Sequence, residues 1–245
     1  MTLNIWKYAA PQTFYPLAGK MIPVFAVLAA VLAAAGLYVG FFVAPTDFQQ
    51  GESYRIIFIH VPAAWMSMFV YVVMAVSSAI GIIWQIRLAD MVAAASAPLG
   101  ASFAFLALVT GSLWGKPMWG AYWVWDARLT SELILLFLYL GYMALQSAID
   151  DQRSADKASG LLAIVGVVNI PIIHYSVEWW NTLHQGATVA KFDKPSMHID
   201  MLVPLLLMAL AFKLFYVTVV LVRTRNEALY RDRNRHWVRE LIEKL

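Results

Sequence analysis

Cysteine is absent from all 245 residues of the sequence, and charged residues are scarce at 13%. The lack of cysteine excludes disulfide bonds, thiolate metal sites and covalent attachment of a cofactor through sulfur, so any metal ligation must use histidine, methionine, tyrosine or carboxylate. Soluble domains carry about 25% charged residues, whereas 61% of this chain is hydrophobic. The composition therefore predicts an integral membrane protein.

Two further absences limit the function. The phosphate-binding loop of ATPases, Gly-x4-Gly-Lys-Ser/Thr, does not occur, since its nearest approach at residues 111–116 is one residue short and precedes Pro117. The net charge of +3 comes mostly from the C-terminal tail rather than from a folded face, which argues against nucleic acid as a partner. Any energy for transport must therefore come from another protein.

Six long apolar runs predict six membrane-spanning helices. Each is close to the roughly 20 residues that cross a bilayer, and a backbone in lipid must satisfy its own hydrogen bonds, which favours helices. The first run is too long for the core of a signal peptide, so we expect it to remain as an anchor. The runs cover about residues 21–43, 58–84, 91–113, 129–149, 159–177 and 200–222.

The connections between these runs leave no room for a separate soluble domain. We therefore expect an all-α integral membrane protein in which residues 1–245 form a single bundle of six transmembrane helices.

The distribution of Lys and Arg predicts the orientation of this bundle. An even number of spans places both termini on one side, and the tail of residues 223–245 is strongly basic. By the positive-inside rule this side is cytoplasmic, which corresponds to a multi-pass protein of the bacterial inner membrane. The outer connections then hold five Lys or Arg, against twelve in the termini and inner loops. These outer connections are residues 44–57, 114–128 and 178–199.

The most unusual stretch is residues 114–126, in the second outer connection. It holds four of the ten tryptophans, with glycine and proline between them, and it fits neither a helical stripe nor a strand. We interpret the loop of about residues 114–128 as an irregular aromatic platform for a flat, π-rich ligand. The alternative is a belt of aromatic residues at the membrane interface. The four tryptophans are Trp114, Trp119, Trp123 and Trp125.

The histidines lie mostly on the predicted outer side. His60 begins the second span, His174 lies near the outer end of the fifth, and His184 and His198 lie in or bound the last outer connection, while His236 is cytoplasmic. Imidazoles beside an aromatic platform would supply axial ligands to a metal held in a flat ligand, and iron porphyrin meets both requirements. The alternative for each is an interfacial histidine that hydrogen-bonds to a neighbouring helix or a headgroup.

The tryptophan-rich stretch resembles the WWD signature of the haem-handling membrane proteins of cytochrome c maturation, and the match continues into Arg128-Leu-Thr-Ser. The segments Phe-Ile-His-Val-Pro-Ala-Ala-Trp-Met around His60 and Trp-Trp-Asn-Thr-Leu-His-Gln around His184 are similar to that family's two flanking histidine segments. The resemblance covers about residues 20–222. The matching residues of the stretch are Trp114-Gly115, Trp119-Gly120, Trp123 and Trp125-Asp126.

Within that system, the length, the number of spans and the cytoplasmic termini resemble those of protein C. Relatives that look like the lyase subunit have long extra spans and large outer domains, which this sequence lacks. The resemblance implies a haem-binding and haem-delivering protein rather than an enzyme. The partners that it implies are a membrane-tethered periplasmic haem chaperone, the ATPase and permease of an ABC-type transporter, and a small single-span membrane protein.

The resemblance also implies a set of site residues. A b-type haem would be held non-covalently and transiently at the outer face, with His60 and His184 as axial ligands and the tryptophan stretch as its platform. Asp126 is a candidate contact for the ligand or a partner, and the alternative is a cap for the fourth helix. Arg128 is a candidate partner for a haem propionate, and the alternative is a solvated loop charge.

Two other functions compete with haem delivery. A membrane oxidoreductase subunit with b-type haem or quinone would need histidine pairs within the spans, whereas the candidates here cluster at the outer face. A proton-coupled carrier would make Lys213 central, because this lysine lies near the middle of the sixth span. It would also need acidic partners inside spans, and Glu132 and Glu178 lie near span ends. We expect Lys213 to face the bundle interior, to pair with a carboxylate or carbonyl, or to reach a protein partner.

Overall fold

The computed structural model describes residues 5–180, 182–184, 186, 188–189, 191 and 194–243. Six segments are long and apolar enough to cross a membrane, and no strand occurs within the described residues. This confirms the prediction of an all-α, six-span membrane protein. The spans are Pro11–Val43, Glu52–Trp84, Arg87–Trp119, Ala127–Ala148, Gln152–Trp179 and Ile199–Arg231.

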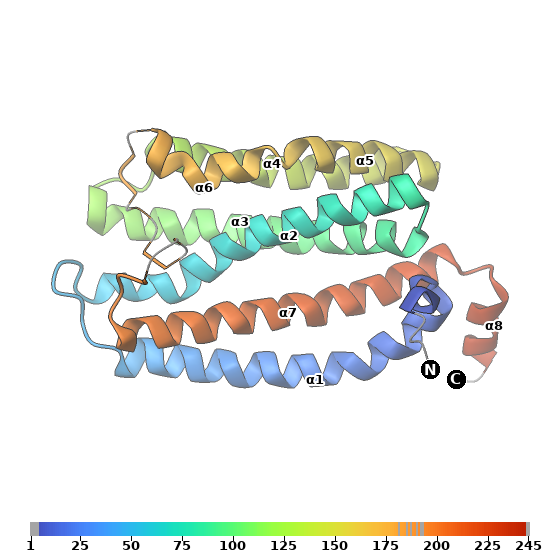
Figure 1. Cartoon of the computed structure of the whole chain (residues 1–245), viewed down its shortest axis with the longest axis horizontal. Coiled ribbons are helices and arrows are strands. Elements are labelled where there is room, and N and C mark those ends of the chain that lie inside the picture. Colours follow the sequence, from blue (N-terminus) through green and yellow to red (C-terminus); the bar gives the residue numbers. More distant parts are fainter. Residues whose placement is uncertain are drawn as a thin grey trace.

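The helices run side by side along one axis, and both ends of the chain lie at the same end of the bundle (Figure 1). Short helical turns occur at Ile5–Ala9, Val39–Val43 and Glu52–Ile56. The α-helices are α1 (Pro11–Tyr38), α2 (Ile57–Trp84), α3 (Arg87–Trp119), α4 (Ala127–Ala148), α5 (Gln152–Gly166), α6 (Asn169–Trp179), α7 (Ile199–Arg231) and α8 (His236–Glu243).

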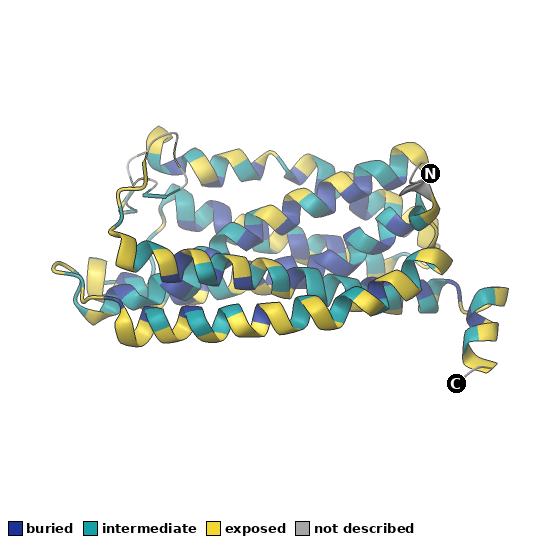
Figure 2. Ribbon diagram, turned by 60° about the horizontal axis from the view of Figure 1, so that its bottom comes forward, coloured by how far each residue is buried: buried dark blue, intermediate teal, exposed yellow. Residues whose placement is uncertain are grey.

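The bundle has its core around α2 and α3, which pack against each other and lie between a pair formed by α1 and α7 and a group formed by α4, α5 and α6. Buried residues concentrate in the middle of the bundle (Figure 2). Large aromatic side chains fill this core, with the Tyr71 and Tyr139 rings edge to face at 5.1 Å. The Tyr139 hydroxyl donates a hydrogen bond of 2.7 Å to the Ser67 carbonyl oxygen. These contacts tie α4 to α2 at mid-depth.

The fifth span is broken into α5 and α6 at Val167 and Val168. Pro171 explains the break, because a proline ring clashes with the carbonyl group four residues earlier and cannot donate a backbone hydrogen bond. The two helices together form one span, Gln152–Trp179, which contains the predicted run of residues 159–177.

The tryptophan-rich stretch is less irregular than the sequence predicts. Helix α3 continues through Trp114 to Trp119, and it ends where Gly120 adopts a left-handed conformation with φ of 77°. The Gly120 N–H donates to the Lys116 carbonyl oxygen at 3.1 Å, which is a common way to end a helix. The irregular part is thus confined to residues 120–126, because α4 already begins at Ala127. The predicted boundaries of about 114–128 were too wide.

Lys213 is exposed on the surface of α7 and does not face the bundle interior. Its ammonium nitrogen lies 4.8 Å from the centroid of the Phe69 ring on α2. Of the three placements expected from the sequence, the first is therefore wrong. The described residues provide it with no carboxylate or carbonyl in hydrogen-bonding range, and the third placement, contact with a protein partner, stays a prediction.

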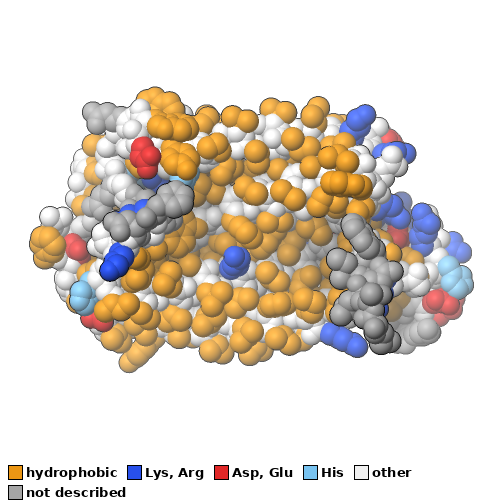
Figure 3. Space-filling view, in the orientation of Figure 1, with side chains coloured by type: hydrophobic (Ala, Val, Ile, Leu, Met, Phe, Trp, Pro, Cys, Tyr) orange, Lys and Arg blue, Asp and Glu red, His pale blue; other side chains and the backbone are white. Residues whose placement is uncertain are grey.

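Charged side chains gather at the end of the bundle that holds the two chain termini (Figure 3). Arg231 bridges Asp156 at 2.8 Å and Glu227 at 2.9 Å, and Arg87 forms an ion pair with Asp232. These contacts explain why α7 extends to Arg231, nine residues beyond the predicted span: its last turns are a charged extension that ties α7 to α3 and α5.

Reporter fusions test the orientation that the basic end predicts. An enzyme that is active only in the periplasm should be active when inserted after Tyr122, in the irregular segment opposite the basic end, and silent when fused after the last residue of the chain. The measurement is reporter activity in intact cells, normalised to the amount of fusion protein. The reverse pattern would contradict the predicted topology.

Candidate functional site

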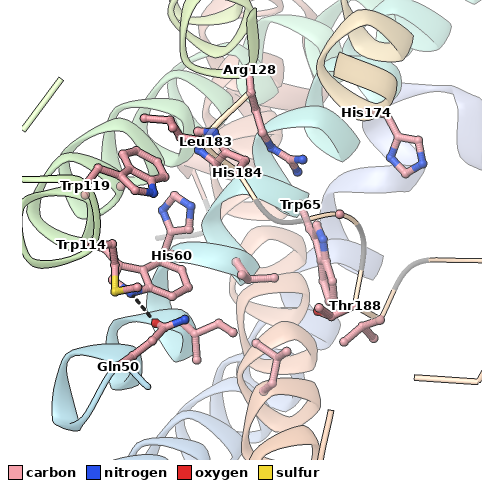
Figure 4. Close-up of a pocket in the computed structure, with 18 of the residues that line it drawn as sticks. Gln50, His60, Trp65, Trp114, Trp119, Arg128, His174, Leu183, His184 and Thr188 are labelled. Atoms are coloured by element: carbon pink, nitrogen blue, oxygen red, sulfur yellow. Dashed lines mark hydrogen bonds between the residues drawn. The ribbon is translucent and has the colours of Figure 1, made fainter. Parts of the chain in front are cut away.

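A pocket opens at the end of the bundle opposite the chain termini, and we call it the outer pocket (Figure 4). Its lining comes from α2, α3, α4, α6 and α7 and from the first and last outer connections, and no lining residue comes from α1, α5 or α8. The sequence-predicted residues that line it are His60, Trp114, Trp119, Arg128 and His184.

His60 is held in one orientation by α3. Its Nδ1 lies 3.0 Å from the carbonyl oxygen of Ala107 and 3.1 Å from the hydroxyl oxygen of Thr110. A carbonyl oxygen only accepts, so Nδ1 must carry the proton, and Nε2 of the neutral ring keeps its lone pair. Gly111 allows this close packing, because a Cβ atom there would lie 2.9 Å from His60 Cε1.

His184 is positioned by Asp126, the N-cap residue of α4. Its Nδ1 lies 2.7 Å from Asp126 Oδ2, and the Thr182 hydroxyl donates to the same carboxylate oxygen at 2.6 Å. The other carboxylate oxygen accepts from the Leu129 N–H at 2.8 Å and so caps α4. Asp126 therefore caps α4, which was one of the two alternatives expected from the sequence. It also orients His184.

The charge state of this pair follows from burial. Burial lowers the pKa of His184, and the nearby Asp126 carboxylate only partly offsets that effect. Burial would raise the pKa of Asp126, but hydrogen bonds from Thr182 and the Leu129 N–H, together with His184, outweigh it and hold that pKa below its usual value. At neutral pH the contact is thus a neutral imidazole that donates from Nδ1 to a carboxylate, which leaves Nε2 unprotonated.

Both histidines therefore present the same atom for ligation. Figure 4 shows the two rings near one another at the pocket, with the Trp119 ring beside them. A histidine that donates its other ring N–H to a carboxylate or a carbonyl is the usual form of a metal-ligating histidine, because that bond fixes the tautomer and raises the basicity of the ligating nitrogen. His60 has the carbonyl version of this arrangement and His184 the carboxylate version.

Two tryptophans of α3 accompany these rings. Trp114 meets the His60 ring edge to face at 5.7 Å, and its Nε1 donates to the Gln50 side-chain oxygen at 3.0 Å. Trp119 meets the His184 ring edge to face at 4.8 Å. The helical continuation of α3 explains the pairing, because it carries the two indoles past the entrance of α2 and up to the last outer connection.

Trp123 and Trp125 are not part of the lining. They form an edge-to-face pair with ring centroids 5.4 Å apart, in the irregular segment before α4. Trp125 is 77% exposed, the larger part of its ring facing away from the bundle. The platform expected from the sequence is thus divided into two indoles inside the pocket and two outside it.

Arg128 carries the only permanent positive charge among the described residues of the pocket lining. It lies in the first turn of α4, four residues before Glu132, a spacing that brings two helical side chains together. Glu132 is only 7% exposed. Arg128 thus lines the pocket one helical turn before a buried carboxylate.

Several lining residues were not identified from the sequence, and three of them are informative. Trp65 and Met68 line the pocket from α2, and Gln50 lines it from the first outer connection. Trp65 could have been found from the sequence. It lies on α2, the helix that also carries His60, and it is eight residues after Ile57 on the same helix face. Gln50 carries no such signal, since its contact with Trp114 joins the first outer connection to α3, 64 residues further along the chain.

The remaining histidines are placed differently. His174 lines the pocket from α6 at the opposite edge from His60 (Figure 4), and its side chain is exposed. His198 accepts a long contact of 3.4 Å from the Asp200 N–H at the start of α7, and His236 begins α8 at the other end. The described residues contain no group of three or more His, Asp or Glu placed to hold an ion. Two imidazoles alone suit a metal that brings its other ligands with it.

Comparison with known proteins identifies the family of the chain. The sequence model of the family described as heme exporter protein C matches residues 4–239. The chain is 52% identical to heme exporter protein C of Haemophilus influenzae, with 98% of this chain and 100% of the relative covered. It is also 52% identical to heme exporter protein C of Escherichia coli, over 100% of this chain and 98% of the relative.

A third relative comes from a plant organelle. The putative cytochrome c biosynthesis ccmC-like mitochondrial protein of Marchantia polymorpha is 50% identical over 76% of this chain and 78% of its own length. A family match over nearly the whole chain, together with relatives of this identity and coverage, shows the family. The chain belongs to the heme exporter protein C family.

Proposed function

We propose that this protein binds b-type haem non-covalently and reversibly in the outer pocket and delivers it for c-type cytochrome biogenesis. The observation that carries the proposal is the matched pair of His60 and His184, each with Nδ1 engaged in a hydrogen bond and Nε2 left with a lone pair. The names of the relatives support haem as the cargo.

The residues of the pocket fit a haem in three respects. The two imidazoles would supply axial ligands, and a porphyrin would supply the other four donors that the protein does not. Trp114, Trp119 and Trp65 offer an apolar, aromatic lining for the flat ring. Arg128 is the cation in position to pair with a propionate.

Each side chain then has a defined task in holding the cargo. His60 and His184 would coordinate the iron, and Asp126 would keep His184 turned toward it while capping α4. Trp123 and Trp125 lie outside the lining, where they would contact the part of the ring that projects from the pocket. The protein positions and releases haem in this proposal and catalyses no bond formation.

The position of the pocket supports delivery outside the membrane. It opens at the end of the bundle opposite the basic termini, which the positive-inside rule assigns to the periplasm of a bacterial inner membrane. We infer that haem passes from there to a membrane-tethered periplasmic chaperone. The energy would come from the ATPase and permease of an ABC-type transporter, with a small single-span protein completing the assembly.

The oxidoreductase alternative gains no support from the structure. Electron transfer across a bilayer through b-type haem uses histidine pairs at more than one depth, and here the two histidines with engaged Nδ1 atoms share one pocket at one end. The bundle core at mid-depth is instead filled by tyrosine, methionine and leucine. Haem delivery is therefore the function that the site supports best.

Replacing either axial candidate tests the ligation. His60→Ala or His184→Ala should abolish the low-spin bis-imidazole absorption spectrum of the haem-loaded protein, while part of the haem remains because the aromatic lining persists. His174→Ala and His198→Ala are the controls, since both lie toward the outer end but neither has its Nδ1 bonded as in the pair. Loss of the spectrum only in a control variant would refute the assignment of the ligands.

Asp126→Asn separates the two tasks of the carboxylate. Asparagine caps a helix about as well as aspartate, so the thermal unfolding temperature should stay close to that of the natural protein. The neutral amide orients His184 less firmly and no longer raises the basicity of the ring, and losses of about 10- to 100-fold in metal affinity are typical for such changes. Titration with haem, followed by absorption, measures the affinity. An unchanged affinity would show that Asp126 is only a cap.

The divided platform predicts a graded effect. Trp114→Ala and Trp119→Ala should each weaken haem retention by roughly two- to tenfold, corresponding to about 0.5–1.5 kcal/mol for an aromatic contact. Trp123→Ala and Trp125→Ala should weaken retention less but impair transfer to the chaperone. Retention is measured by the rate of haem loss to a competing apoprotein. Equal retention in all four variants would indicate an interfacial aromatic belt.

A further inference from the structure

Lys213 presents its charge where the bilayer tolerates it least. It is exposed on α7, thirteen residues after Asp200 and ten before Arg223. At about 1.5 Å per residue, the nearer of these charged positions is roughly 15 Å away along the helix. That distance exceeds the reach of a lysine side chain, so Lys213 cannot place its ammonium group at either interface by extending along the helix.

The protein itself compensates this charge only in part. The Phe69 ring offers a cation–π contact at 4.8 Å, and Phe69 in turn packs edge to face on Tyr216 of α7 at 6.1 Å. Within the described residues no acidic side chain reaches the ammonium group. The aromatic contact fixes Lys213 at the junction of α2 and α7 and leaves its remaining N–H donors pointing out of the bundle.

The surface around Lys213 has the form of a helix-binding strip. On α7 the exposed residues Leu206 and Leu210 continue to Lys213 at spacings of four and three, which is one helical stripe. On α2 the exposed residues Phe69 and Val76 belong to a second stripe beside it. Apolar exposure is ordinary in lipid, so the charge within the strip is the feature that demands an explanation.

Three possible binding partners of this strip are excluded by their chemistry. A lipid headgroup lies at the interface and not at mid-depth. A second copy of this chain offers no suitable acid among its described residues, because Glu132 is buried and the other carboxylates lie in terminal helical turns or outside the spans. A small ligand such as a haem propionate would need a hollow, and neither Lys213 nor Phe69 lines the outer pocket, whose last lining residue on α7 is Leu205, eight residues before Lys213.

We propose that the strip formed by Leu206, Leu210 and Lys213 of α7 with Phe69 and Val76 of α2 binds a transmembrane helix of a partner subunit, and that this helix carries an Asp or Glu at mid-membrane depth. Pairing would satisfy both charges inside the bilayer, and the aliphatic residues on either side of Lys213 would pack against the partner helix. The proposal does not depend on haem binding, because it concerns the flank of the bundle and not the outer pocket.

Co-purification of the assembly with a tag on this chain tests the pairing. Lys213→Met keeps the length of the side chain and removes the charge, so recovery of the partner subunit should fall by about three- to tenfold. Lys213→Arg should retain the partner. Phe137→Met on α4, which replaces an exposed residue on another flank, is the matched control and should also retain it. The isolated Lys213→Met chain should stay monodisperse and lose no thermal stability.

A crosslink identifies the helix and its acid. A photoreactive residue at Leu210, one turn from Lys213, should crosslink one partner span that contains Asp or Glu near its middle. Changing that acid to Lys should lower recovery, and combining it with Lys213→Glu should restore it. A crosslinked span without such an acid, or full recovery with Lys213→Met, would overturn the proposal.

Measuring haem binding by the Lys213→Met chain distinguishes the proposed helix contact from an alternative in which Lys213 contacts haem. The isolated Lys213→Met chain should keep the natural haem spectrum and affinity. If it instead loses haem while the partner is retained, Lys213 serves the cargo and the proposed helix contact is wrong. Failure of the haem proposal itself would appear with the His60 and His184 variants and would leave the recovery and crosslinking results unchanged.

Discussion

The whole structure depends on the requirement that polar groups in a bilayer find partners within the protein. Backbone groups meet it by forming helices, and at mid-depth the Tyr139 side chain meets it by donating to the backbone carbonyl oxygen of Ser67. Chemistry that needs unpaired lone pairs is thereby displaced to the ends of the bundle. The outer pocket lies at one of these ends, where Nε2 of His60 and of His184 can remain without a partner until a ligand arrives.

The same requirement explains how much could be predicted. Six spans and the all-α fold follow from the length and polarity of the apolar runs, which report directly on the bilayer. His60 and His184 were predicted from their sequence contexts, and both line one pocket. Their hydrogen-bond partners could not be predicted, because Ala107 contributes only its backbone carbonyl group and Asp126 lies 58 residues before His184. Such long-range contacts depend on packing and leave no periodic signal in the sequence.

The wrong expectation for residues 114–119 has its cause in local backbone chemistry. Tryptophan and glycine in residues 114–119 suggested irregular structure, yet α3 continues to Trp119 because packing against α2 outweighs weak helix propensity. Gly120 then ends the helix, so two indoles enter the pocket and two do not. The expectation that Lys213 faces the bundle interior was wrong for a different reason. It followed from the high cost of a charge exposed to lipid, whereas Lys213 is exposed on α7, and its contact with a protein partner stays a prediction.

The two candidate ligands differ in how firmly they are held, and this difference bears on release. His60 stands in the first turn of α2, with its Nδ1 bonded to the backbone of α3 in the core of the bundle. His184 lies in a connection between helices and is oriented through side chains, those of Asp126 and Thr182. Moving His60 would require α2 and α3 to separate, whereas moving His184 requires only that its hydrogen bonds to the side chains of Asp126 and Thr182 break. In the proposed function, His184 is therefore the ligand that an acceptor can replace, and the aromatic lining beside His60 retains the ring during the exchange.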